Sequence, residues 1–145
     1  MSTSAIGTTL DALCDGLRAQ LTGVNVYSAD VSLEEAGLEC IAFMGASLEE
    51  SAAAMGGTRE ETWRIQAAVQ TILKPWQDDA ERTIRAARDR ALELFAEVET
   101  YCNDTYVGSY PDVEVEAGEL MQTYSVEGRV CALSFTVTLR QMKNP

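Results

Sequence analysis

The segment EETWRIQAAVQTILKPWQDDAERTIRAARDRALELFAEVETYC, residues 60–102, contains the two repeating patterns from which the fold is predicted. Between residues 63 and 73 apolar side chains alternate with polar or small ones, which predicts a strand with one buried face. After Pro75 the apolar residues recur at steps of three and four as far as residue 102. That spacing draws one apolar stripe along a helix. A long strand leading directly into a long helix is therefore the centre of the predicted fold.

The same reasoning predicts the elements on either side of this segment. The acids of Gln77-Asp78-Asp79 are expected in the first turn of the long helix, where they favour its dipole. Residues 45–58, which include Gly56-Gly57, are expected to form an extended loop or one arm of a hairpin. The predicted elements are helices over 3–22 and from about 77 to 103, and strands over 24–27, 38–44, 61–73, 113–117 and 131–140.

These elements follow the order α-β-β-β-α-β-β, which predicts an α+β fold. We expect a mainly antiparallel sheet of about five strands with two helices packed on one face. A chain of 145 residues is expected to form a single domain over residues 1–145, because a chain of that size buries about 68–70% of its unfolded surface. It contains no apolar run near the roughly 20 residues that span a bilayer, and its N-terminus has no secretory pattern. A soluble protein made in the cytoplasm is expected.

Residues suited to catalysis are scarce. The chain has no histidine, which excludes the commonest general base and imidazole ligands. No glycine-rich phosphate loop is present. The pairs Glu34-Glu35, Glu49-Glu50 and Glu60-Glu61 have the chemistry of a hydrolase or hard-cation site, but they flank predicted loops and are interpreted as solvated surface charge. We therefore expect no enzyme activity, no cofactor and no metal.

Trp63 is expected in the core, because it lies on the buried face of its predicted strand. The four cysteines have wide, irregular spacing, so they are expected to be buried free thiols. They are Cys14, Cys40, Cys102 and Cys131.

Charge is distributed unevenly along the chain. The formal net charge is −12, which disfavours direct binding to nucleic acid or to an anionic membrane. Between residues 28 and 62 eight acids accompany one base, and between residues 111 and 128 five acids accompany none. The long helix carries the arginines Arg82, Arg85, Arg88 and Arg90. A surface polarised in this way indicates a binding partner.

Three stretches of the chain resemble the tail terminator proteins of long-tailed (siphovirus-type) bacteriophages. They are GTREETWRI (57–65), RDRALELFAEVE (88–99) and GRVCALSFTV (128–137). A charged, aromatic strand, a helix with an Arg-Asp-Arg-Ala stretch and a closing Phe-Thr-Val strand are typical of that family. The chain departs from the family at YVGSYP (106–111), where Leu-Gly-Gly is more usual. This departure leaves the role of the loop open.

The resemblance implies a structural virion protein without catalytic activity. Members of the family form a homohexameric ring on the head-proximal end of the tail tube, stop its polymerisation and provide the docking surface for the neck. The implied partners are the tail tube protein and the head–tail connector, with DNA passing through the ring without specific binding. The protein would be assembled in the host cytoplasm and located in the tail of the virion, at its neck region.

Charge alone suggests which residues make the contacts of such a ring. The candidate subunit interface joins Arg82, Arg85 and Arg88 of one copy to the acidic 28–62 region of the next, represented by Glu34, Glu35, Glu49 and Glu50. The candidate acidic lumen, or exposed strand face, comprises Glu114, Glu116 and Glu119.

Two other functions are compatible with the sequence. One is another phage neck or head-completion protein, and the other is an acidic inhibitor that mimics DNA and acts on a host enzyme. A stable hexamer in solution would favour the terminator, whereas a monomer or dimer would favour the inhibitor.

Overall fold

The computed structural model describes residues 6–29, 31, 37–52, 59–74, 79–104, 112–126 and 128–143. Two helices and a five-stranded mixed sheet follow the predicted order α-β-β-β-α-β-β, so the predicted α+β class is confirmed. The elements are α1 (Ile6–Gln20), β1 (Asn25–Tyr27), β2 (Glu39–Ala52), β3 (Arg59–Leu73), α3 (Ala80–Asp104), β4 (Asp112–Ser125) and β5 (Gly128–Lys143).

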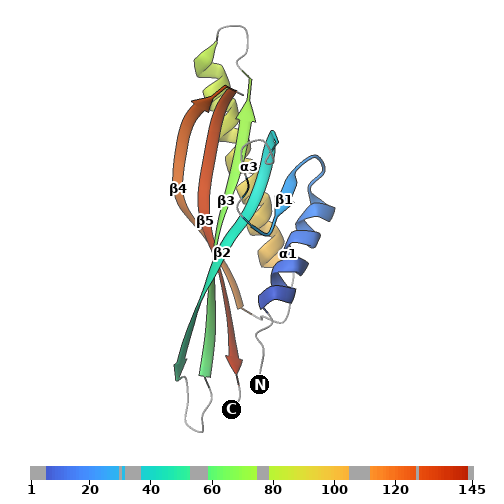
Figure 1. The fold of residues 1–145 in the computed structure, drawn as a ribbon, viewed down its shortest axis with the longest axis vertical. Helices are drawn as coiled ribbons and strands as arrows, with labels where there is room; N and C mark the ends of the chain where they lie inside the picture. The colour runs from blue at the N-terminus through green and yellow to red at the C-terminus, as the bar shows by residue number, and fades with distance from the viewer. Residues whose placement is uncertain are drawn as a thin grey trace.

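The sheet is long, strongly twisted and mainly antiparallel (Figure 1). Its strand order is β1-β2-β3-β5-β4, with the short β1 at one edge and the 14-residue β4 at the other. Only the β1–β2 pair is parallel. β2, β3 and β5 run beyond the helices at one end of the molecule (Figure 1).

β2 is twice as long as predicted. The expected strand over 38–44 ends too early, because β2 continues to Ala52 in antiparallel register with β3. A bulge between Phe43 and Gly45 shifts the register. Phe43 pairs with Ala67 before the bulge, and Leu48 pairs with Trp63 after it. Both therefore lie on the same face of the sheet, although one has an odd and the other an even residue number. The bulge therefore hides the period of two, and residues 45–52 form one arm of a long hairpin, while 53–58 lie outside the described residues.

β4 is also longer than the predicted 113–117, for the same physical reason. Its register shifts between Ala117 and Leu120, and beyond that bulge the strand continues to Ser125. At the bulge the Glu119 N–H donates to the Ser134 hydroxyl at 2.8 Å. A Cβ at residue 118 would lie 2.8 Å from the same hydroxyl, so glycine permits this close approach.

Both helices contribute to a single core on one face of the sheet. The largest side chains with under 2% exposure on that face include Leu13 and Leu17 of α1, Leu94 of α3 and Phe135 of β5. The Phe135 ring makes edge contacts with two other phenylalanine rings, at centroid distances of 6.0 and 5.4 Å. The predicted apolar stripe on the long helix is confirmed, because its buried residues are Thr83, Ala87, Ala91, Leu94, Val98 and Cys102.

The start of α3 differs from the prediction. The helix begins at Ala80 rather than near 77, and Asp79 precedes it as the N-cap, with its carboxylate accepting the Arg82 N–H at 3.0 Å. Gln77 and Asp78 lie outside the described residues. Farther along, the buried Thr71 hydroxyl donates to the Ala87 carbonyl at 2.7 Å and so joins β3 to α3.

All four cysteines are buried and free, as predicted. Burial raises the pKa of Cys14 to about 11 and that of Cys102 to about 12. Since a raised pKa favours the neutral thiol, these groups behave as small apolar side chains. No helix among the described residues is long and apolar enough to cross a membrane.

Candidate assembly surfaces

The face of the sheet opposite the helices is called here the open face. Because cross-strand partners share a face, the register places alternate residues of β2, β3, β5 and β4 on it. The main core with both helices lies on the other face. The buried apolar residues of the open face are Cys40 and Ala42, in a small cluster with Tyr27 and Val31 at the β1–β2 edge, and the paired Ile72 and Val130 at one end of β3 and β5. Its centre carries small polar or apolar side chains, namely Gln66, Ala68, Ala132, Ser134, Thr136 and Thr138.

Acidic residues outnumber basic ones on the open face. Glu114 and Glu116 of the candidate acidic lumen project from it and are exposed, and Glu119 is exposed at the β4 bulge. Arg140 donates to Glu114 at 3.0 Å and lies 3.7 Å from Asp112, which raises the pKa of Arg140 mainly through its hydrogen bond to Glu114. The register also places the charged residues Glu49, Glu60 and Arg64 on the open face. The three predicted lumen acids therefore lie on one exposed edge strand.

The arginines of α3 bind acids of their own chain. Arg85 forms an i,i+4 pair with Glu81 at 2.9 Å, and Arg88 pairs with Asp89 at 3.1 Å. The Asp89 carboxylate accepts from Arg88 rather than from Arg85, although Arg85 lies one turn away. These side chains are exposed, so each pair contributes little to stability and is able to exchange partners.

Arg90 has a structural role that the sequence did not indicate. Its guanidinium forms a two-point contact with Glu39, with Nε on one carboxylate oxygen and Nη2 on the other, and a further bond with Glu93. The hydrogen bond to Glu39 is the main reason for the raised pKa of Arg90. The Arg90 and Glu39 side chains are 30% and 25% exposed. This partly buried fork ties the middle of α3 to the start of β2.

The acidic half of the candidate interface is described only in part. Glu34 and Glu35 lie outside the described residues. Glu49 is on the open face and accepts from Arg64 at 2.6 Å, while Glu50 lies in β2 with its side chain outside the described set. Within one subunit, therefore, the α3 arginines and Glu49 lie on opposite sides of the sheet.

Glu61 corrects one sequence interpretation. The sequence favours solvated surface charge at this position, yet the exposure of Glu61 is only 1%. It shares a face with Trp63, whose indole N–H donates to its carboxylate at 2.7 Å. Trp63 is partly buried and packs against the core, as predicted. The i,i+2 spacing of the two residues in a strand was the available signal, because it places both on one face.

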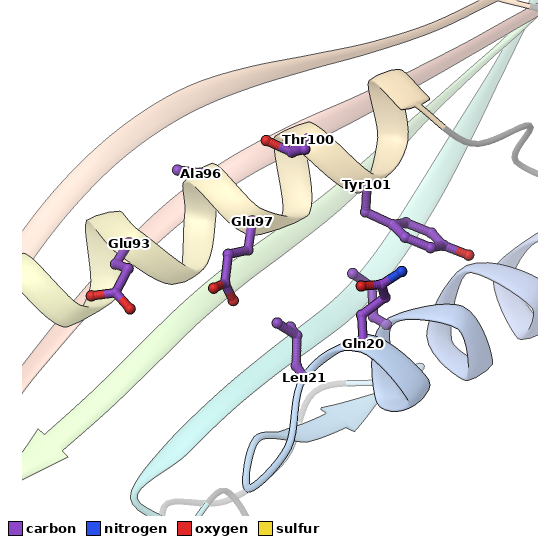
Figure 2. A pocket seen from close by; sticks show the side chains of 8 residues that line it. Gln20, Leu21, Glu93, Ala96, Glu97, Thr100 and Tyr101 are labelled. Carbon is purple, nitrogen blue, oxygen red and sulfur yellow. The ribbon is translucent and has the colours of Figure 1, made fainter.

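A groove of about 460 Å³ lies between α1 and α3. Figure 2 shows Glu97 of α3 directed towards Leu21, which follows α1, while Glu93 lies one turn farther along α3. Tyr101 closes one end of the groove, with its hydroxyl in the space that a Cβ on Gly16 would occupy. No pattern in the sequence predicts this groove, because it depends on how two distant helices pack.

The second half of β4 and the residue after it carry exposed apolar side chains on both faces of the sheet, and residues 120–126 are called here the apolar end of β4. Leu120, Met121, Tyr124 and Val126 are 38, 61, 73 and 102% exposed. The Arg129 guanidinium lies 5.4 Å from the Tyr124 ring centroid, where it makes a cation–π contact. Four exposed apolar side chains within seven residues distinguish this half of the edge strand from the acidic first half.

The described residues contain no group of three or more Cys, Asp or Glu side chains placed to hold a metal ion.

In comparisons with known proteins, no family model matches the chain and no curated protein matches it.

Proposed function

We propose that this protein is a phage tail terminator, which forms a ring on the head-proximal end of the tail tube, ends tail polymerisation and docks the neck of the head. The observation that carries the proposal is the open face, an acid-rich sheet surface with both helices on its other side. The stretches that resemble the family fall largely within β3, α3 and β5, which are the elements that build the centre of the domain.

The open face suits the wall of a channel through which DNA passes. Glu114 and Glu116 carry negative charge on a surface of small polar side chains. A wall of this kind repels phosphates, so DNA slides past without specific binding. Six copies, each with a net charge of −12, would strengthen this repulsion.

Subunit contacts in the ring are proposed to use the α3 arginines. A closed ring needs two different patches on each subunit. The exposed pairs of Arg85 and Arg88 are weak, so these side chains can exchange to acids in the 28–62 region of a neighbour. The double variant Arg85→Glu/Arg88→Glu should lose the ring, while Asp11→Lys/Asp15→Lys, which reverses two exposed charges on α1, serves as the charge-reversal control. Intact hexamers in the double variant would exclude this contact.

The direct test is tail capping. Purified protein added to growing tail tubes should stop their elongation, and electron microscopy should show rings at one end. Light scattering should give the mass of six chains for the ring form. Tubes that grow at an unchanged rate in the presence of excess protein would refute the proposal, and a monomer that inhibits a DNA-binding enzyme would favour the acidic inhibitor.

The channel assignment has a separate test. Glu114→Lys/Glu116→Lys should still form rings, because the substituted residues face the channel, but those rings should now retain DNA in a gel-shift assay at low salt. Asp11→Lys/Asp15→Lys on the exposed side of α1 changes the charge equally and is the control. Equal DNA retention by both variants would place Glu114 and Glu116 outside the channel.

A further inference from the structure

β4 is an edge strand with an outer side that no described strand covers. It pairs with β5 on one side only and lies last in the strand order. Alternate N–H and C=O groups along its 14 residues therefore point away from the sheet. Such an edge is a template for another strand, and proteins normally protect it with charges, bulges or a covering element.

Protection is confined to the first half of β4. Acids occur at Asp112, Glu114, Glu116 and Glu119, and the bulge at Ala117–Leu120 interrupts the ladder there. From Leu120 to Val126 there is no charged residue and no proline. The apolar end of β4 is thus the unprotected half of an otherwise protected edge.

We infer that the β4 edge receives an extended segment of another protein as a sixth strand. The occupant is specified by the two halves of β4: basic side chains beside Asp112–Glu119 and uncharged apolar ones beside Leu120–Val126. Main-chain hydrogen bonds supply affinity and side-chain contacts supply specificity in this mode of recognition. The inference concerns binding by one subunit and does not depend on the proposed ring.

The described part of this chain does not provide a matching strand. β1, at the other edge of the sheet, has only three residues, which is too short to cover the seven of Leu120–Val126. A second β4 in parallel register would bring like charges together, because each copy carries four acids in its first half. In antiparallel register those acids would lie opposite Leu120–Val126 of the other copy, which carries no base to pair with them. Charge complementarity therefore favours a basic segment from a different protein.

A small hollow beside the apolar end of β4 adds a place for one side chain. It has a volume of about 70 Å³ and lies between α3 and the β4–β5 hairpin. Ile84 and Ala87 of α3 and Val130 of β5 line it, and its polar side is formed by Gln122 and Thr123 of β4 and Arg129 of β5. Its lining favours a small aliphatic side chain of the added strand.

The experiment uses a fluorescent peptide of twelve residues that alternates lysine with valine in one half and threonine with valine in the other. Binding to the full chain is followed by fluorescence anisotropy at low salt. Hydrogen exchange is measured on the same complex, and the amides of 120–126 should become protected. A peptide with glutamate in place of lysine should bind at least about 10-fold more weakly, because like charges on adjacent strands repel.

Two exposed methionines provide a matched pair of variants. Met121→Lys places a charge on the unprotected edge and should weaken binding at least about 10-fold, since edge lysines block strand addition. Met142→Lys makes the same change at the end of β5, on a residue of similar exposure, 52% against 61%, and should bind normally. Equal loss in both variants, or no protection of 120–126, would overturn the inference.

Self-association is the remaining outcome. A mass of two chains that Met121→Lys returns to one would show that β4 pairs with a second copy, which would also overturn the inference. Tail capping by the wild-type protein is measured separately, so failure of peptide binding leaves the proposed function to its own test.

Discussion

Among the buried threonines, Thr9 and Thr71 allow one chemical change to be tested in two environments. Each side chain is 1% exposed. The Thr71 hydroxyl donates to the Ala87 carbonyl at 2.7 Å, whereas the Thr9 hydroxyl has no hydrogen-bond partner in the described part of the chain. Replacement by valine keeps the branched shape and removes only the hydroxyl. The two substitutions are therefore expected to change the free energy of unfolding in opposite directions.

The magnitudes follow from the cost of burying a polar group. Thr71→Val should lower the free energy of unfolding by about 1 kcal/mol, the net value of a buried hydrogen bond. Thr9→Val should raise it by about 1 kcal/mol, because an unsatisfied buried hydroxyl costs about 1–3 kcal/mol. Helix propensity does not obscure the second value, since threonine and valine rank together. The expected change in melting temperature is about 3 °C in each direction.

Urea unfolding followed by circular dichroism measures both values. The protein concentration must be equal in all samples, because association adds to apparent stability. The slope of free energy against urea should stay constant, which shows that only stability has changed. If both variants are destabilised by similar amounts, the assignment of satisfied and unsatisfied hydroxyls is wrong.

Further predictions concern the backbone, an ion pair and the thiols. Gly128→Ala should lower the free energy of unfolding by at least about 2 kcal/mol, because φ is +138° and the new Cβ would lie 2.3 Å from a backbone carbonyl oxygen. As a control, Gly7→Ala on α1, where a Cβ has open space, should leave the free energy of unfolding unchanged or raise it in the same urea assay. Arg90→Met should lower the free energy of unfolding by about 1–3 kcal/mol, since it leaves the partly buried Glu39 carboxylate without its two-point partner. An unchanged midpoint of urea unfolding would show that the Arg90–Glu39 contact does not hold α3 on β2. Thiol ionisation should make stability fall as pH rises from about 9 to 11: the unfolded thiols lose protons near pH 9, while burial holds the pKa of Cys14 at about 11 and that of Cys102 at about 12. The free energy of unfolding should fall by at most about 1.4 kcal/mol per pH unit for each thiol, and this dependence vanishes below pH 9. Cys102→Ala should make the fall with pH smaller, and an equal fall in that variant would show that Cys102 does not contribute.

Local patterns predicted the elements whose periodicity is uninterrupted. In β3 and β5 apolar and polar residues alternate along most of the strand, and in α3 the apolar stripe repeats over several turns. Such long, regular patterns predict which side of each element is buried. The predictions fell short at β2 and β4, where the bulges after Phe43 and Ala117 shift the alternation by one residue. A bulge changes the face of every later side chain, and a search for a fixed period ends the strand there.

Sites were predictable only where they depend on local order. The sequence placed Glu114 and Glu116 on one strand face, and the structure agrees. It did not predict the burial of Glu61 against Trp63, because formal charge alone favours an exposed position. It also did not predict that Arg90 forks onto Glu39, which lies 51 residues away.

The sequence by itself determined the class of fold, the order of the elements, the acidic charge and the absence of histidine, since these depend on composition and short-range period. Only the tertiary structure decided which strands are neighbours, and with that which surfaces are left uncovered. Pairing of β3 with β5 puts β4 at the edge, and packing of both helices on one side leaves the open face. These outcomes depend on contacts between residues far apart in the chain, which local patterns do not record. The segment of residues 60–102 defined the centre of the domain, whereas the surfaces proposed for assembly arise from what packs around it.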